Sequence, residues 1–190
     1  MSNIEIFIYK DTGEALENTL FGQRLERYNQ AIREETKRKH LVGSQVVFQV
    51  LGFYNLSDQL LLQAFEKSAH EIENLPFYIS FSNSDSFYVL AISKTPVGID
   101  AEVLRERSDL VYDTYLGNGD KDYKKKRFYK KWLEKEAKIK ISCCSSRHEM
   151  YYRRRSEIVI GICGIQHSNL LAFKINHLSN EPVRIDLDEF

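Results

Sequence analysis

The chain has 190 residues and a formal net charge of zero, and 43% of its residues are hydrophobic. Eleven Tyr and eleven Phe residues supply apolar surface for a folded core, which excludes a disordered chain. No apolar run approaches the length of a membrane span, and residues 1–10 lack the pattern of a signal peptide. The three Cys residues have no metal-type spacing, so we expect reduced thiols and a cytoplasmic location.

The first half of the chain predicts one strand, then helices, then two strands. Residues 4–8 alternate in polarity as a strand does, whereas 24–51 and 60–72 have the period of amphipathic helices. Two further strands are predicted at 77–81 and 87–93. The turn-forming residues Asn83, Ser84 and Asp85 lie between these two strands and predict a tight turn there.

The second half predicts the same order of elements after a seam at Pro96. A strand begins at Val97 and a helical stretch includes residues 128–141. Strand-like runs follow, and they cover 157–165, 170–175 and 183–187. We therefore expect an α+β fold of two similar α/β lobes, 1–95 and 96–190, related by a pseudo-two-fold axis.

An acidic motif lies on the strand that opens the second half. Val97, Ile99, Ala101 and Val103 alternate with the polar or small residues Gly98, Asp100 and Glu102. Because side chains two apart on a strand point the same way, Asp100 and Glu102 should lie side by side, opposite an apolar face.

A second acidic motif lies on the helix predicted around 128–141. At 100° per residue, Glu136 and Lys140 fall within the arc of apolar side chains that includes Trp132. Three carboxylates that converge beside one lysine are costly to bury unless a cation or ligand compensates their charge. The pattern favours a functional site, and the alternative is an ordinary surface pair between Glu136 and Lys140.

The two motifs together resemble a known family. Gly-Ile-Asp-x-Glu at 98–102, followed by Trp-x-x-Lys-Glu-Ala-x-x-Lys at 132–140, is similar to the motif pair of the two-lobed, monomeric 4′-phosphopantetheinyl transferases. Residues 79–84, Ile-Ser-Phe-Ser-Asn-Ser, resemble that family's Ile-Ser-x-Ser-His-Ser-like segment. Residues 38–43 resemble the basic segment at the head of a long helix in its N-terminal lobe. The matches follow the family's order over more than half of the chain.

The resemblance implies an enzyme that transfers 4′-phosphopantetheine from coenzyme A to a serine of an acyl or peptidyl carrier protein. The reaction would require Mg²⁺ and release adenosine 3′,5′-bisphosphate. By resemblance, Asp100, Glu102 and Glu136 are the metal ligands, and Glu136 and Lys140 are the catalytic residues. The N-terminal lobe would then contact coenzyme A through a set of polar residues, namely Arg38, Lys39, Ser82, Asn83 and Ser84.

The charge of the second half is uneven and bears on the partner. Residues 121–155 contain fourteen Lys or Arg against four Asp or Glu, an excess that would attract an acidic carrier protein or a phosphorylated molecule. Two other functions stay open. One is a coenzyme A or carrier-protein binding module without catalysis, because Asn83 stands where the family has His. The other is a basic nucleic-acid-binding protein, although no motif for nucleic acid accompanies the charge.

Overall fold

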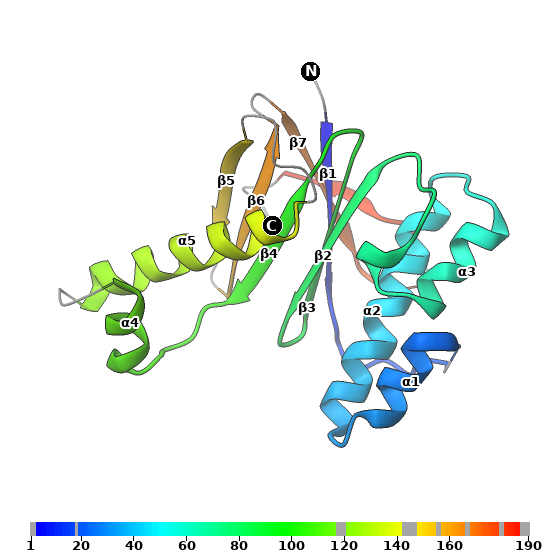
Figure 1. Cartoon of the computed structure of the whole chain (residues 1–190), viewed down its shortest axis with the longest axis horizontal. Coiled ribbons are helices and arrows are strands. Elements are labelled where there is room, and N and C mark those ends of the chain that lie inside the picture. The colour runs from blue at the N-terminus through cyan, green and yellow to red at the C-terminus, as the bar shows by residue number, and fades with distance from the viewer. Residues whose placement is uncertain are drawn as a thin grey trace.

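The structure is a computed structural model in which two β-sheets are covered on their outer sides by helices (Figure 1). It describes residues 3–17, 19–116, 121–141, 148–154, 157–165, 168–178 and 181–186. The strands are β1 (Asn3–Lys10), β2 (Tyr78–Ser84), β3 (Phe87–Ser93), β4 (Gly98–Val103), β5 (His148–Arg154), β6 (Ile158–Ile165), β7 (Asn169–Ile175) and β8 (Val183–Ile185). The helices are α1 (Gly22–Gln30), α2 (Glu34–Gly52), α3 (Asp58–Glu66), the short 3₁₀ helix η1 (Ala69–Glu71), α4 (Asp109–Leu116) and α5 (Lys121–Ile139).

The two halves of the chain repeat one connectivity. In the first half, β1 pairs antiparallel with β3, and β3 pairs antiparallel with β2. In the second half, β4 pairs antiparallel with β6, and β6 with β5, while α4 and α5 connect β4 to β5. The chain is therefore α+β, as the sequence predicts, and each half forms a three-stranded β-α-β-β unit.

The C-terminal strands return to the first sheet. Strand β7 pairs parallel with β1, with Ile6 opposite Ala172, and β8 pairs antiparallel with β7. The larger sheet thus has the order β2-β3-β1-β7-β8, whereas the smaller one is β4-β6-β5. The range 96–190, expected as one lobe, consequently supplies strands to both sheets.

Alternating apolar residues give the larger sheet a core on each face. Ile4, Ile6 and Ile8 point from β1 toward the smaller sheet and pack with Ile99 and Ile160, among others. On the other face, residues of β1 and β3 pack against α2 and α3, in a cluster that includes Phe7, Tyr9, Val46, Val50, Leu51, Ala64 and Leu90. The two sheets consequently lie face to face between two helical layers.

The structure corrects several local predictions. Asn83 and Ser84 belong to strand β2, and the turn is formed by Asp85 and Ser86, because a two-residue hairpin suits the positive φ of 48° at Asp85. The helix predicted at 24–51 is two helices, since residues 31–33 leave the helical conformation. Strand β5 and helix α4 were not predicted. Cys163 is buried and reduced, while Cys143, Cys144 and Leu187 lie outside the described residues.

Among the helices of the described residues, none has both the length and the apolar character needed to span a bilayer.

Candidate functional site

The edge of β2 and the edge of β4 meet through serine hydroxyls. Ser80, Ser82 and Ser84 alternate along β2 and are all buried. Their Oγ atoms accept the backbone N–H groups of Ile99, Ala101 and Val103, at 3.0, 3.3 and 3.0 Å respectively. The serine junction, formed by Ser80, Ser82 and Ser84, thus replaces the main-chain hydrogen bonds that would join two neighbouring strands. It also fixes the register between the two sheets.

Asp100 lies at the centre of this junction and is only 6% exposed. Its Oδ1 accepts the Ser82 hydroxyl at 2.7 Å and the Lys140 ammonium at 2.7 Å. Its Oδ2 is buried and has no hydrogen-bond partner in the described structure. An unsatisfied buried carboxylate oxygen is costly, so this atom is the place where a cation or a ligand donor would be favoured.

Two glycines allow helix α5 to bring Lys140 to Asp100. A Cβ on Gly98 would collide with the carbonyl oxygen of Ala137, and one on Gly161 would lie 2.7 Å from Cβ of Leu133. The helix backbone therefore rests directly on β4 and β6. Lys140, just beyond the end of α5, then reaches both the Ile99 carbonyl, at 3.1 Å, and Asp100.

Glu102 lies next to Asp100 on the same face of β4 and has its own partners. Its Oε2 accepts the Ser84 hydroxyl at 3.2 Å and forms an ion pair with Arg107 at 3.4 Å. Burial raises the pKa of the Glu102 carboxyl above its ordinary value, although Arg107 and the Ser84 hydroxyl oppose this effect. The sequence prediction that these two carboxylates lie side by side on a strand agrees with their placement.

Glu136 is half-buried on α5, one turn before Lys140. No hydrogen bond or ion pair joins its carboxylate to another of the described residues. Within that part of the chain, no three His, Cys, Asp or Glu side chains lie close enough to hold a metal ion. The set of Asp100, Glu102 and Glu136 as metal ligands thus stays a prediction.

The donor chemistry at Asp100 and Glu102 nevertheless suits magnesium. Mg²⁺ prefers carboxylate oxygens and retains several waters, so it does not need three protein ligands. The unpartnered Oδ2 of Asp100 is a donor of this kind. The residues present therefore fit this metal in donor type.

The two basic residues expected to contact coenzyme A have acidic partners. Arg38 donates to both carboxylate oxygens of Asp11, at 2.6 Å each, and also to the Glu14 carbonyl at 3.0 Å. Lys39 pairs with Glu35 at 2.8 Å. The Arg38 guanidinium lowers the pKa of the Asp11 carboxyl through its hydrogen bonds. Arg38 thus ties the chain after β1 to the start of α2.

The three polar residues expected at a phosphate do not share one side of β2. Ser82 and Ser84 face β4, where both hydroxyls already donate to carboxylates. Asn83 lies between them, so it points to the opposite side of the strand, and it is exposed. Only Asn83 of the three therefore offers an exposed side chain.

Two residues of the site were not singled out from the sequence. Ser80 binds the backbone of β4, and Arg107 binds Glu102. The alternation of serine at 80, 82 and 84 is a detectable signal, because three hydroxyls on one strand face predict a polar contact. Arg107 has no comparable signal, since it lies in the loop after β4.

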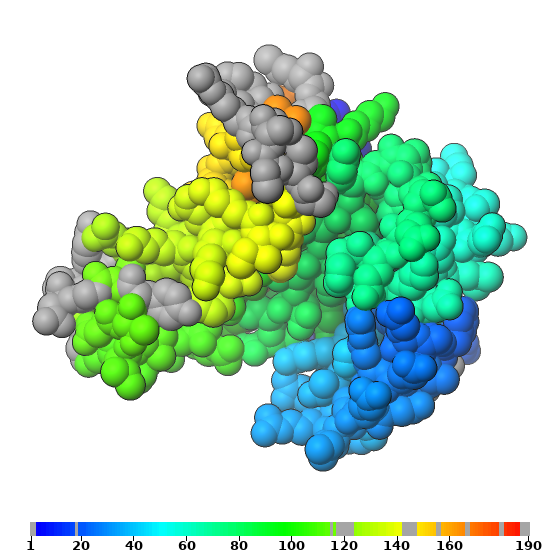
Figure 2. Space-filling view, in the orientation of Figure 1, coloured from blue at the N-terminus to red at the C-terminus, as the bar shows by residue number. Residues whose placement is uncertain are grey.

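A basic pocket lies beside α5, and one of its lining residues, Val159, is the cross-strand partner of Glu102. It has a volume of 560 Å³, and its walls come from α5, β5 and β6 together with Leu104. Its cationic side chains are Lys125, Lys126, Lys130 and Arg154. The Lys130 ammonium lies 5.3 Å from the centre of the Tyr152 ring, while Lys125 pairs with Glu106. Figure 2 shows the surface of α5 in yellow-green, well separated from the blue surface of α1 and α2.

The comparisons with known proteins do not assign the chain to a family. No protein-family model matches it, and no curated protein matches its sequence.

Proposed function

We propose that the protein is a 4′-phosphopantetheinyl transferase that uses coenzyme A and an acidic carrier protein. The observation that carries this proposal is Asp100, buried between Ser82 and Lys140, whose Oδ2 has no partner among the described residues. The repeated β-α-β-β connectivity supports the two-lobed, pseudo-two-fold fold that the motif resemblance implies. Both motifs of that resemblance meet at this point, one from β4 and the other from α5.

The reaction would form a bond between the carrier serine oxygen and the phosphorus next to pantetheine. The bond from that phosphorus to the departing adenosine 3′,5′-bisphosphate would break, and the serine would lose its proton. A magnesium ion held by Asp100, Glu102 and Glu136 would neutralise charge on the diphosphate. Glu136, whose carboxylate is half-buried, is the base that we assign to the serine proton.

Lys140 has the second assigned role. Its side chain is 29% exposed, and its ammonium already donates to the Asp100 carboxylate. A cation in this position favours negative charge that builds on phosphate oxygens during transfer. Ser82 acts on Asp100, because its hydroxyl orients Oδ1 and leaves Oδ2 for another donor or a cation.

The test is incubation with coenzyme A, Mg²⁺ and a panel of apo carrier proteins, followed by intact mass. We expect one carrier to gain the mass of one phosphopantetheine group, and no carrier to gain it when Mg²⁺ is omitted. Asp100→Asn is the inactive variant, because it keeps the shape of the side chain but removes its charge. An exposed acid away from the site, Glu181→Gln, is the matched control. Transfer by Asp100→Asn at the wild-type rate would contradict the assignment.

A second candidate is a binding module that holds coenzyme A or a carrier without transfer. Asn83 supports it, since it stands where the resembled family has a histidine and its amide brings no positive charge. Calorimetric titration with coenzyme A separates the two: binding without transfer to any carrier favours the module.

A further inference from the structure

A carboxylate lies on the helix-covered face of the larger sheet, on the central strand β1. Glu5 alternates with Ile4 and Ile6, which face the smaller sheet, so its side chain points to the other face. Its neighbours on that face, Phe7 and Ile92, belong to the apolar cluster beneath the helices. A half-buried carboxylate among such neighbours costs free energy unless a donor or a cation compensates its charge.

Tyr54 is the one partner of the Glu5 side chain among the described residues. The Tyr54 hydroxyl donates to Oε2 of Glu5. Burial, together with this hydrogen bond, raises the pKa of the Tyr54 hydroxyl, so Tyr54 stays neutral and brings no positive charge. Oε1 of Glu5 accepts nothing from the described residues and is not sealed from solvent, so it remains available to a ligand.

A pocket of 360 Å³ opens beside this carboxylate, a volume within the usual range for sites that hold small molecules. Its walls come from β1, the end of α2, β7 and the residues just before β8. Four aromatic rings line it, and they belong to Phe7, Phe53, Tyr54 and Phe173. The Phe7 ring stacks on Phe173, with 5.0 Å between centroids, and meets Tyr54 edge-on at an angle of 72°. The aromatic surface therefore has two walls at a steep angle.

The lining carries negative charge. Its acidic side chains are Glu5 and Glu181, and no Lys, Arg or His is among the described residues that line it. Lys94 lies nearby, but it lines an adjoining pocket that shares Glu5 and Tyr54. No ion pair joins Lys94 to Glu5. The negative potential of this pocket favours a cation over an anion.

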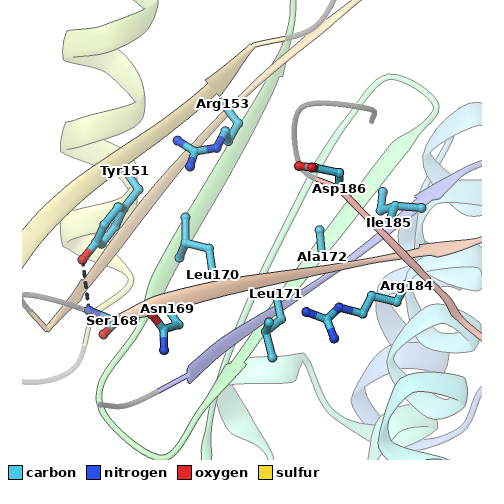
Figure 3. Close-up of a pocket in the computed structure, with 10 residues that line it drawn as sticks. All are labelled: Tyr151, Arg153, Ser168, Asn169, Leu170, Leu171, Ala172, Arg184, Ile185 and Asp186. Carbon is cyan, nitrogen blue, oxygen red and sulfur yellow. Dashed lines mark hydrogen bonds between the residues drawn. The ribbon is translucent and has the colours of Figure 1, made fainter.

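Arg184 is the other cation close to this pocket. It pairs with Phe173 across β7 and β8, so it lies on the same face of the larger sheet as Phe173. Figure 3 shows this arrangement from the pocket on the opposite face, where Leu170 and Ala172 point away from Arg184. Arg184 does not line the aromatic pocket and forms no ion pair with Glu5. It should therefore repel a bound cation weakly rather than hold a ligand.

The combination of ring faces and a carboxylate is suited to an organic cation. An ammonium group over an aromatic ring is attracted by the negative face of the ring, and the attraction grows as water is excluded. A metal ion such as Ca²⁺ or Mg²⁺ instead requires about six oxygen ligands. The oxygen donors of this lining's side chains are two carboxylates and one hydroxyl, whereas most of its surface is aromatic.

We propose that this pocket binds a small organic cation, with its alkylammonium group between Glu5 and the aromatic rings. Glu5 supplies the opposite charge through Oε1, while Tyr54 holds Oε2 in place. Phe53, which is 41% exposed, offers a ring at the mouth of the pocket. None of the lining residues belongs to the site around Asp100, so the proposal does not depend on the transfer reaction.

The test is calorimetric titration of the full chain with choline, ethanolamine and 3,3-dimethylbutan-1-ol, the neutral analogue of choline in which carbon replaces nitrogen. We expect at least one of the two cations to bind, and the neutral analogue to bind at least about tenfold more weakly than that cation. Choline alone would indicate a quaternary ammonium ligand, and ethanolamine alone a primary ammonium. Absence of binding by both cations, or equal binding of the neutral analogue, would overturn the proposal.

Variants locate the binding on the pocket. Glu5→Gln keeps an acceptor for Tyr54 and should weaken the cation about tenfold, while Phe53→Leu should weaken it about threefold through the lost ring face. Glu26→Gln, at an exposed acid on α1, is the matched control and should leave the affinity unchanged. Arg184→Gln should bind the cation at least as tightly as wild type, because it removes a like charge.

The same variants can contradict the proposal. Unchanged affinity in Glu5→Gln and Phe53→Leu, or weaker binding in Arg184→Gln, would place the cation elsewhere. If Glu5→Gln folds poorly, Glu181→Gln replaces it, since Glu181 is exposed and should also weaken the cation when its charge is removed. The comparison of choline with its neutral analogue needs only the wild-type protein, so it decides the role of charge in either case.

Discussion

The Ser82 hydroxyl donates to Asp100 while it accepts the backbone N–H of Ala101, so one side chain joins the two sheets and orients the buried carboxylate. Ser84 repeats the arrangement with Glu102 and Val103. The serine spacing on β2 therefore matches the carboxylate spacing on β4, because both strands have a side-chain period of two. The contact between the two sheets and the proposed chemistry therefore both depend on the hydroxyls of Ser82 and Ser84.

Ser82→Ala should destabilise the protein by about 2 kcal/mol, because it leaves the buried N–H of Ala101 without an acceptor and removes a donor from Asp100. Urea denaturation at neutral pH measures this free energy of unfolding. Ser57→Ala is the control, since Ser57 is exposed and makes no capping hydrogen bond with its side chain. Equal stability of the two variants would show that the serine junction contributes nothing measurable.

Lys140→Met should destabilise the protein by up to about 3 kcal/mol, because it leaves the Asp100 charge buried without its cation. Asp100→Asn together with Lys140→Met should recover part of this loss, since no charge then remains unpaired. A double-mutant cycle by urea denaturation gives the coupling free energy. If the losses of unfolding free energy in the two single variants simply add up in the double variant, Asp100 and Lys140 do not stabilise each other. Lys138→Met, which removes the exposed pair with Glu134, is the matched control and should cost less than about 1 kcal/mol.

The acidic strand could be predicted because its pattern is local. Ile99 and Ala101 face the inter-sheet core, while Asp100 and Glu102 face away, as the alternation indicates. Helix α5 was also predictable, because its apolar residues recur on one side at the helical period, and Lys140 falls on that same side. Both signals lie within about ten consecutive residues, where a period of two or 3.6 can be read directly.

The return of β7 to the first sheet could not be predicted. Residues 170–175 read as a strand, but nothing in them indicates parallel pairing with β1 at the other end of the chain. The same reason explains why the ion pair of Arg38 was not predicted. Its partner Asp11 lies 27 residues earlier and is brought to it only by the fold, whereas the contact of Arg38 with coenzyme A, expected from the family resemblance, stays a prediction.

The stability of the protein should fall as the pH drops through the range in which His40 titrates. Burial lowers the pKa of the His40 imidazole, and Arg24 and Arg27 add to this effect. The unfolded chain therefore binds a proton more readily than the folded one. This contribution to stability is present above the unfolded pKa of about 6.5 and is lost below it.

The measurement for His40 is urea denaturation at about pH 5 and about pH 8, on either side of the ordinary imidazole pKa. His40→Gln should reduce the difference in unfolding free energy between these two conditions. His70→Gln, at an exposed histidine on η1, serves as the control and should keep the wild-type difference. An unchanged pH dependence in His40→Gln would assign the effect to other groups.

Asn83→His should strengthen coenzyme A binding, and more so at about pH 6 than at about pH 8, because the imidazolium charge is lost above a pKa of about 6.5. The exposed position of Asn83 on β2 allows the larger side chain without repacking. Calorimetric titration with coenzyme A at both values measures the effect. The same affinity in wild type and variant at both values would place Asn83 outside the nucleotide site.

The carrier protein is expected to dock on the basic pocket beside α5, so its cations should control the encounter. Lys124 is a poor choice for reversal, because it is buried and paired with Asp113. Lys126→Glu, Lys130→Glu and Arg154→Glu are better choices, since these side chains line the pocket directly. We expect the triple reversal to raise KM for the carrier and to leave the affinity for coenzyme A unaltered.

Salt provides the complementary measurement, because exposed charges act mainly on the rate of encounter and are screened as ionic strength rises. The wild-type rate at low carrier concentration should fall with added salt, whereas the triple variant should be slow and nearly insensitive to it. Arg33→Glu on the far helical layer is the control and should behave as wild type. If the triple reversal weakens coenzyme A binding and spares the KM for the carrier, the basic pocket belongs to the nucleotide and the carrier docks elsewhere.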